Sequence, residues 1–337
     1  MPLAVGRMVS FCAACGVATL TALGQTRDLA SRALLFVSNE VSRDVTVVRL
    51  ADLTVVATIP TGERPRGIQV SPDQRRVYVA LSDSIPTVRS AGDAIGVIDV
   101  ATRRLIARYP AGTDPEQFVI TPGGTKIYAA NEDAGTASAI NVRTGRVSET
   151  MAVGIEPEGV AVSPDGRWVY VTAETSNTVS VIDTKSDRVV ASFLVDVRPR
   201  AATFAPDGRR AYVTAEIGGS VSVVDTQARD VVATIPLGER AKPVGIVASP
   251  DGSRLYVANG GMHNVAVIDV AAGRVAATIP VGRRPWGIAM LRDGSRLFTA
   301  NGLTDDVSVI DTRTNAVTAT VKVGRRPWGI AVVEPYR

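Results

Sequence analysis

Apolar residues occur along the chain in short runs that alternate with charged or glycine-rich turns. One unit of this pattern contains four such runs: Gly159–Ser163, Trp168–Thr172, Val179–Asp183 and Arg188–Phe193. The runs are rich in Val, Ile, Thr and Tyr, and Pro, Asp, Gly and Ser separate them, as is typical of strands and tight turns. No part of the repeated region has the 3.6-residue apolar spacing of a helix. The pattern therefore predicts four short strands per unit.

The unit occurs seven times. An aromatic residue in the second predicted strand marks each copy, at spacings of 42, 50, 42, 42, 44 and 42 residues: Phe36, Tyr78, Tyr128, Tyr170, Tyr212, Tyr256 and Phe298. Four strands in about 42 residues is the size of one β-propeller blade. The longer spacings locate an eight-residue insertion between Leu81 and Ile95 and a two-residue insertion in Gly238–Gly245.

The two ends of the repeated region complete each other. The first copy begins at its second strand, Leu34–Ser38, and the last copy ends after a first strand, Gly329–Val333. Together these ends form one blade and close the ring, which removes exposed strand edges. We predict an all-β fold, a seven-bladed propeller of four-stranded antiparallel blades, over residues 25–337. The alternative, an open β-solenoid, would need polar capping repeats, and the sequence lacks them.

Residues 1–24 differ from the repeats and predict a secretory signal peptide. A basic start is followed by the small, apolar segment Met8–Leu23, with small residues before Gln25. The segment is short for a membrane span, although an uncleaved anchor is the alternative. We therefore expect a secreted, periplasmic protein. Cys12 and Cys15, the only cysteines, lie in this segment, so the mature chain would lack disulfide, thiolate and covalent haem chemistry.

Composition argues against several classes of function. The net charge of +4 is spread over the repeats without a basic run, so nucleic acid is not an expected partner. His263 is the only histidine and cannot build a multi-histidine metal site. The sequence has neither a nucleophile elbow nor a phosphate-binding loop. We expect no metal site and no catalytic residues.

Several motifs resemble a known family. Tyr170-Val-Thr-Ala, Tyr212-Val-Thr-Ala and Tyr256-Val-Ala-Asn, with the strands and Pro-Asp-Gly turns that follow them, resemble the YVTN β-propeller repeat over residues 34–333. Glu156-Pro-Glu-Gly and Arg284-Pro-Trp-Gly resemble its periplasmic branch associated with PQQ-dependent catabolism. This resemblance implies a non-catalytic binding or scaffold propeller in quinoprotein alcohol catabolism. It also implies a quinoprotein dehydrogenase or transport component as partner, PQQ as a candidate ligand, and a monomer.

The turns before the first strands and those between the second and third strands share one face of a propeller. The residues beside the junction prolines on this face are the predicted ligand- or partner-binding set: Arg66, Glu116, Glu158, Arg198, Arg200, Arg284, Trp286, Arg326 and Trp328. The second group of turns adds acids: Glu40, Asp83, Glu132, Glu174 and Glu216. The backbone dictates glycine and proline in the junctions, whereas the side chains between them vary among copies.

We predict that this face is a cationic, aromatic half-ring that binds a partner protein or a planar anion through stacking and charge-assisted hydrogen bonds. In the alternative, Trp286 and Trp328 plug the channel, and the arginines form a solvated rim paired with the acids. The insertion at 82–94 falls on the same face, as a lid or partner contact or as a drifted loop.

Two other functions stay open. One is a lactonase-type hydrolase, because lactonases also use seven-bladed propellers. It would need an acid/base pair, for which Glu116 with Glu158, or His263, are the candidates. The other is a structural or adhesive propeller without a discrete ligand.

Overall fold

The computed structural model describes residues 1, 33–62, 64–82 and 92–334. The predicted signal peptide, Asp83 and most of the insertion at 82–94 lie outside the described residues. Export, periplasmic location and a role for that insertion therefore stay predictions. In the described part of the chain, no helix has the length and apolar character needed to cross a membrane.

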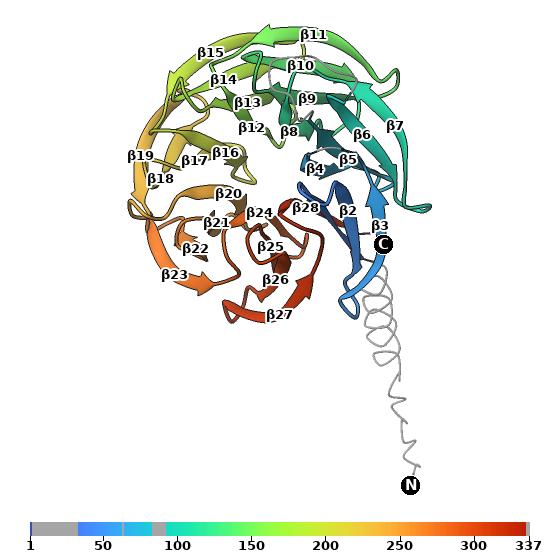
Figure 1. The fold of residues 1–337 in the computed structure, drawn as a ribbon. Helices are drawn as coiled ribbons and strands as arrows, with labels where there is room; N and C mark the ends of the chain where they lie inside the picture. Colours follow the sequence, from blue (N-terminus) through green and yellow to red (C-terminus); the bar gives the residue numbers. More distant parts are fainter. Residues whose placement is uncertain (2–32, 63, 83–91, 335–337) are drawn as a thin grey trace.

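The described residues form seven four-stranded antiparallel sheets arranged as a ring (Figure 1). From the centre outward, blade 1 consists of β28 (Pro327–Val333), β1 (Leu34–Asn39), β2 (Asp44–Arg49) and β3 (Thr54–Pro60). Blades 2 to 4 follow in chain order: β4 (Pro65–Val70), β5 (Arg76–Leu81), β6 (Ala94–Asp99), β7 (Arg104–Pro110); β8 (Pro115–Ile120), β9 (Lys126–Asn131), β10 (Thr136–Asn141), β11 (Arg146–Ala152); β12 (Pro157–Val162), β13 (Trp168–Ala173), β14 (Thr178–Asp183), β15 (Arg188–Leu194).

Blades 5 to 7 complete the ring: β16 (Pro199–Phe204), β17 (Arg210–Ala215), β18 (Ser220–Asp225), β19 (Asp230–Pro236); β20 (Pro243–Ala248), β21 (Arg254–Asn259), β22 (Asn264–Asp269), β23 (Arg274–Pro280); β24 (Pro285–Met290), β25 (Arg296–Asn301), β26 (Asp306–Asp311), β27 (Ala316–Lys322). The predicted fold class is confirmed.

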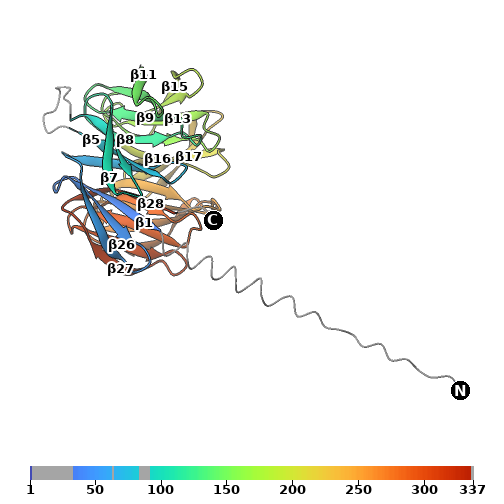
Figure 2. The same ribbon diagram turned by 90° about the vertical axis from the view of Figure 1, so that its right-hand side faces the viewer.

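The ring closes between the two ends of the repeated region. The C-terminal strand β28 pairs antiparallel with β1, with Leu34 opposite Val333 and Phe36 opposite Ala331. The two strands run side by side in the perpendicular view of Figure 2. The predicted closure, in which the C-terminal inner strand joins the N-terminal three strands, is confirmed.

The hydrophobic core lies between neighbouring blades. Phe36 and Val47 of blade 1 pack with Ile68 and Val79 of blade 2, and equivalent clusters occupy the other interfaces. Burying each such aliphatic or aromatic side chain contributes about 1.5–3 kcal/mol. Middle strands such as β13 are therefore covered on both faces and buried over almost their whole length, whereas the outermost strand β7 alternates between exposed and partly buried residues.

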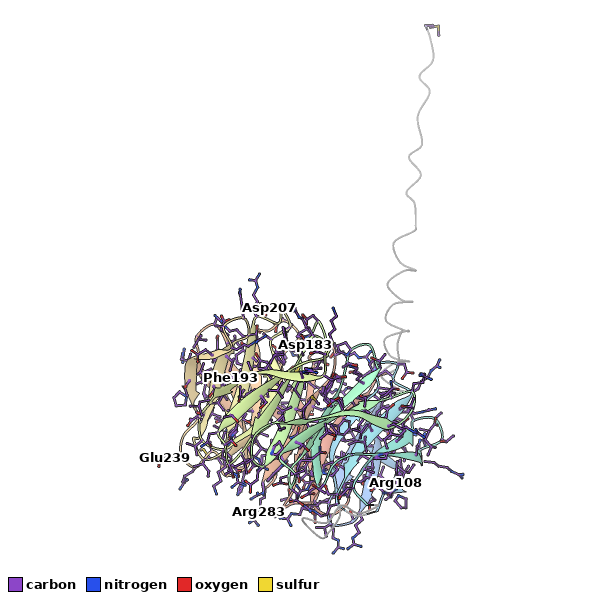
Figure 3. The ribbon with its side chains drawn as sticks, turned by 90° about the horizontal axis from the view of Figure 1, so that it is seen from above. Arg108, Asp183, Phe193, Asp207, Glu239 and Arg283 are labelled. Carbon is purple, nitrogen blue, oxygen red and sulfur yellow. The ribbon has the colours of Figure 1, made fainter. Side chains whose placement is uncertain are left out.

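The junction glycines allow the blades to meet near the axis. A Cβ added to Gly159 would lie 2.3 Å from the carbonyl oxygen of Arg200, and one on Gly287 would lie 2.5 Å from that of Trp328. Real Cβ atoms do not approach this closely, so glycine is needed where inner strands contact each other. The turns that precede these strands lie on one side of the ring. Figure 3 shows Glu239 and Arg283, from two such turns, opposite Asp183 and Asp207.

Candidate functional site

Most of the charged residues of the junction turns line one cavity of about 450 Å³. Its wall includes most of the predicted set, namely Arg66, Glu158, Arg198, Arg200, Arg284, Trp286, Arg326 and Trp328, and three of the predicted acids, Glu40, Glu132 and Glu216. Arg64 and Asp114, which are not in the predicted set, line it as well. The structure thus brings residues from all parts of the sequence to one mouth of the central channel. Glu116 and Glu174 do not line the cavity but contact arginines that do.

A recurring backbone arrangement holds these side chains in place. The residue before each junction proline has a positive φ, for example 60° at Arg198 and 55° at Arg284. Its carbonyl accepts a hydrogen bond from the first residue after the second strand, as in Glu216 N–H to Arg198 O at 2.8 Å. The arrangement places the two groups of turns against each other, so their side chains converge on the cavity.

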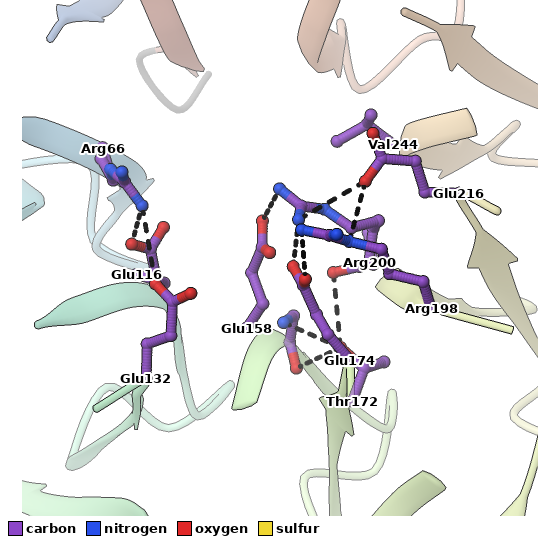
Figure 4. Close-up of polar contacts among 12 residues, drawn as sticks. Arg66, Glu116, Glu132, Glu158, Thr172, Glu174, Arg198, Arg200, Glu216 and Val244 are labelled. Atoms are coloured by element: carbon purple, nitrogen blue, oxygen red, sulfur yellow. Dashed lines mark hydrogen bonds and ion pairs between the residues drawn. The ribbon is translucent and has the colours of Figure 1, made fainter. Parts of the chain in front are cut away.

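On the side of blades 4 and 5, Arg200 is the centre of a buried ionic network (Figure 4). Its residue is 6% exposed, and its guanidinium lies 2.7 Å from Glu158 and pairs also with Glu174. Glu216 lies 3.6 Å away. Arg198 contacts Glu174 at 2.8 Å and Glu216 at 3.2 Å, so the two arginines share three carboxyl groups.

The pKa of Glu158 is raised in this network. Burial raises the pKa of this carboxyl well above its ordinary value, and the hydrogen bond and charge of Glu174 raise it further. Arg200 opposes the shift but is shared with other acids. Burial also opposes the charge on Arg200, yet Glu158, Glu174 and Glu216 outweigh it and raise the pKa of the guanidinium. Glu158 therefore holds its proton more firmly than an ordinary glutamate does.

On the side of blades 2 and 3, Arg66 has the corresponding place. It pairs with Glu116, contacts Glu40 at 3.2 Å, and lies 3.9 Å from Glu132. Glu116 is only 1% exposed. Its carboxylate is therefore neutralised inside the wall and does not face a ligand.

Glu132 is the most exposed of the glutamates that line the cavity. It follows β9, and its side chain is 28% exposed. Burial raises the pKa of this carboxyl, and Asp114 and Glu174 add to the shift, while Arg66 and Arg200 oppose it. A carboxyl with a raised pKa in a cavity suits proton transfer near neutral pH. On sequence alone, Glu132 is only one of the acids of the second group of turns. Nothing in its motif distinguishes it from Glu40 or Glu216.

The two junction tryptophans contact each other. The Trp286 and Trp328 ring centres lie 5.9 Å apart with an angle of 40° between their planes. Trp328 is 7% exposed, and the Cζ atoms of Arg200 and Arg284 lie over the Trp286 ring, 5.0 and 4.6 Å from its centre. Both rings also line a narrower cavity of about 140 Å³ along the inner strands. This arrangement favours the alternative in which the tryptophans close the channel rather than offer free faces for stacking.

Three acids could hold a cation. Ligand oxygens of Asp114, Glu116 and Glu132 lie within 4.8 Å of one another. Arg64 and Arg66 contact the same carboxylates, with Arg64 at 3.4 Å from Asp114. The arginines thus supply the counter-charge that a cation would otherwise bring.

His263 lies beside the main cavity, not in it. It lines a neighbouring cavity of about 490 Å³, together with Arg240 and Lys242 from the turn that contains the two-residue insertion. Its Nδ1 atom accepts a hydrogen bond from the backbone N–H of Arg284 at 3.2 Å. The candidate acid/base pair of Glu116 with His263 or Glu158 is therefore not assembled around one open space.

Two different protein-family models match the N-terminal and the C-terminal parts of the chain. The family model "Choice-of-anchor I domain" matches residues 36–192, and the model "Lactonase, 7-bladed beta-propeller" matches residues 196–332. No curated protein matches the sequence. 

Solved structures share the fold at low identity. A hydrazine synthase chain from Kuenenia stuttgartiensis is 23% identical with a TM-score of 0.74, covering 83% of this chain and 92% of that one. A functionally unknown protein from Desulfotomaculum acetoxidans DSM 771 is 19% identical with a TM-score of 0.78, covering 90% and 99%. A putative 6-phosphogluconolactonase from Bacteroides fragilis NCTC 9343 is 18% identical with a TM-score of 0.73, covering 89% and 98%.

These findings correct the expected function. The prediction of a non-catalytic scaffold for PQQ-dependent catabolism is wrong, because the lactonase model matches residues 196–332 and putative 6-phosphogluconolactonases are among the structures of the same fold. The motifs behind that prediction, Glu156-Pro-Glu-Gly and Arg284-Pro-Trp-Gly, lie in junction turns that recur in every blade, so they indicate the fold rather than a role. PQQ as a ligand, the YVTN repeat type and the partner stay predictions. The chain is a seven-bladed β-propeller with a lactonase match in its C-terminal part.

Proposed function

We propose that this protein is a lactone hydrolase and that the reaction takes place in the cavity of about 450 Å³. The lactonase match over residues 196–332 supports this class of reaction. The observation that carries the proposal is the placement of Glu132, a partly exposed carboxyl of raised pKa in a cavity walled by arginines.

The chemistry requires one proton acceptor and a positive wall. Glu132 in its charged form takes a proton from a water molecule whose oxygen attacks the lactone carbonyl carbon. The carbonyl oxygen becomes negative, and the arginine side chains of the wall stabilise that charge. The ring carbon–oxygen bond then breaks, and the leaving oxygen receives the proton from Glu132. One water is consumed, and the product is a hydroxy acid.

The other acids have supporting roles in this proposal. Glu116 neutralises Arg66 within the wall, and Glu158 and Glu174 fix Arg200. Arg66 lies closer to Glu116 than to Glu132, from which it is 3.9 Å away, and the Glu132 side chain stays 28% exposed to water. Arginines held in place by these acids can stabilise the developing negative charge without rearranging.

The test is hydrolysis of gluconolactone and γ-butyrolactone by the full chain, followed as acid release and corrected for the spontaneous reaction. We expect Glu132→Gln to lower kcat/KM by about 10²- to 10⁴-fold, the usual contribution of a general base. Glu149→Gln removes an equally charged side chain from the exposed outer strand β11 and should leave the rate unchanged. Absence of hydrolysis of both lactones by the wild type, or full activity in Glu132→Gln, would overturn the proposal.

A further inference from the structure

Arg284 differs from the other arginines of the cavity wall. Each of the others pairs with at least one carboxylate: Arg64, Arg66, Arg198, Arg200 and Arg326. Arg284 makes no ion pair with any residue that the structure describes, although it is half-buried in the same wall. A cation in a partly buried position normally has a counter-charge.

The repeat explains why the counter-charge is absent. The position after the second strand is defined by its N–H bond to the residue before the junction proline, and four copies have glutamate there: Glu40, Glu132, Glu174 and Glu216. In blades 6 and 7 the same position is Gly260 and Gly302, with the same backbone bonds at 3.0 and 2.9 Å. These are the two copies of that position beside Arg284. Both copies of this position that adjoin Arg284 therefore lack the acid found in four other blades.

The backbone does not require glycine at these two positions. Neither Gly260 nor Gly302 has a positive φ. An added Cβ at Gly302 would lie 3.4 Å from the Pro327 carbonyl oxygen and 3.5 Å from that of Arg284, which is ordinary van der Waals contact. A glutamate side chain would fit the local backbone, as it does in four other blades. Glycine at these positions leaves space beside Arg284 and places no carboxylate next to its positive charge, although the backbone would accept a larger residue.

The guanidinium of Arg284 contacts an aromatic ring and has no hydrogen-bond acceptor among the described residues. Its Cζ atom lies over the Trp286 ring, 4.6 Å from the ring centre. Stacking uses the face of a guanidinium and leaves the donors at its edge, which match the oxygens of an oxyanion. Burial lowers the pKa of Arg284; the charges of Glu216 and Glu40 oppose this shift, whereas those of Arg326 and Arg200 add to it.

The backbone of Arg284 is also fixed from outside the cavity. His263 Nδ1 accepts its N–H at 3.2 Å. In two other sectors a side-chain oxygen makes the same contact, Asn177 Oδ1 with Arg198 N–H and Asp305 Oδ1 with Arg326 N–H, both at 2.8 Å. The acceptor is therefore a repeated device that holds the arginine before the junction proline in its positive-φ conformation.

We propose that Arg284, with the open positions Gly260 and Gly302, is a subsite that binds an oxyanion of a ligand, and that His263 is its positioning residue. The ligand class is a small molecule with a carboxylate or phosphate group. The subsite does not depend on lactone hydrolysis. Where hydrolysis occurs, it would hold an anionic substituent of the substrate or the carboxylate that ring opening creates.

The first experiment is calorimetric titration of the full chain at low ionic strength with gluconate and, separately, inorganic phosphate. We expect saturable binding of at least one, weakened about tenfold or more by Arg284→Gln, because a charge-assisted hydrogen bond is lost. Gly302→Glu supplies the acid present in other blades and should weaken binding similarly, whereas Gly302→Ala should not. Gluconate binding alone identifies a carboxylate subsite, and phosphate binding alone a phosphate subsite.

The second experiment tests His263. His263→Ala should weaken binding of the same anion, and His263→Asn should restore it, because asparagine performs this function at position 177. Circular dichroism and thermal unfolding check that each variant is folded. The proposal is overturned when neither anion binds the wild type, or when Gly302→Glu and Arg284→Gln bind as tightly as the wild type does. Loss of hydrolysis in Glu132→Gln with anion binding intact would separate this subsite from the proposed reaction.

Discussion

Arg200 offers the sharpest test of how the cavity wall is stabilised. The substitution Arg200→Gln removes the cation while leaving a side chain of related length and polarity. The arginine residue is 6% exposed and contacts Glu158, Glu174 and Glu216. Removing one partner of a buried ion pair leaves an uncompensated charge and costs about 3–5 kcal/mol.

Three features of the site modify this magnitude. Glu158 can retain its proton, so fewer carboxylates are left without a positive partner when Arg200 is removed. Arg198 still contacts Glu174 and Glu216, which also reduces the cost. The cation–π contact of Arg200 with Trp286 is lost, which increases it. We therefore expect a loss of about 3 kcal/mol, toward the lower end of the range.

The assay is thermal unfolding of the full chain at about pH 7, with Arg210→Gln as a control. Arg210 pairs with Asp225 on the surface, where its side chain is 41% exposed, so its removal should cost about 0–1 kcal/mol. With about 2 °C per kcal/mol for a chain of this size, Arg200→Gln should lower Tm by about 6 °C. Equal Tm changes in the two variants would refute the view that the Arg200 network is a buried, stabilising one.

Two further predictions concern protonation and packing. Because the pKa of Glu158 is raised in the folded chain, its protonated form contributes stability at acidic pH that is lost as pH rises. Urea unfolding at about pH 5 and about pH 8 should therefore show a smaller decrease for Glu158→Gln than for the wild type; parallel decreases would contradict the shift. Gly159→Ala forces a Cβ within 2.3 Å of a carbonyl oxygen and should cost about 1–3 kcal/mol. Gly123→Ala, where a Cβ meets nothing within 4 Å, should stay within about 0.5 kcal/mol, and equal costs would contradict the close blade contact.

The fold could be predicted from the sequence because each repeat contains the strand pattern of one complete blade. The marker aromatics from Phe36 to Phe298 each lie in the second strand of a blade, and the incomplete ends pair as β1 and β28. Strand identity depends on local composition, and closure depends on counting copies, so neither requires knowledge of side-chain contacts. The face of the junction turns follows from the same topology.

The chemistry of the site could be predicted only in part. Sequence spacing places Glu116 and Glu132 on the same face, but it does not show that Arg66 neutralises Glu116 while Glu132 stays partly exposed. It also does not show that Arg200 and Arg284 cover Trp286. These outcomes depend on contacts between side chains of different blades. Motifs that represent one blade at a time do not contain that information.

Differences between copies are therefore more informative about function than the repeat itself. The repeat requires glycine at position 159, where a blade contact excludes any side chain, and that glycine says nothing about a ligand. Gly302 is different, because the same backbone bond supports glutamate in four other copies. At this position the fold permits an acid, and four copies have one. The copy beside Arg284, which has no ion pair among the described residues, has glycine instead, and packing alone does not explain that choice. In a ring of equivalent blades, such departures locate the sector where a ligand's charge replaces a missing side chain.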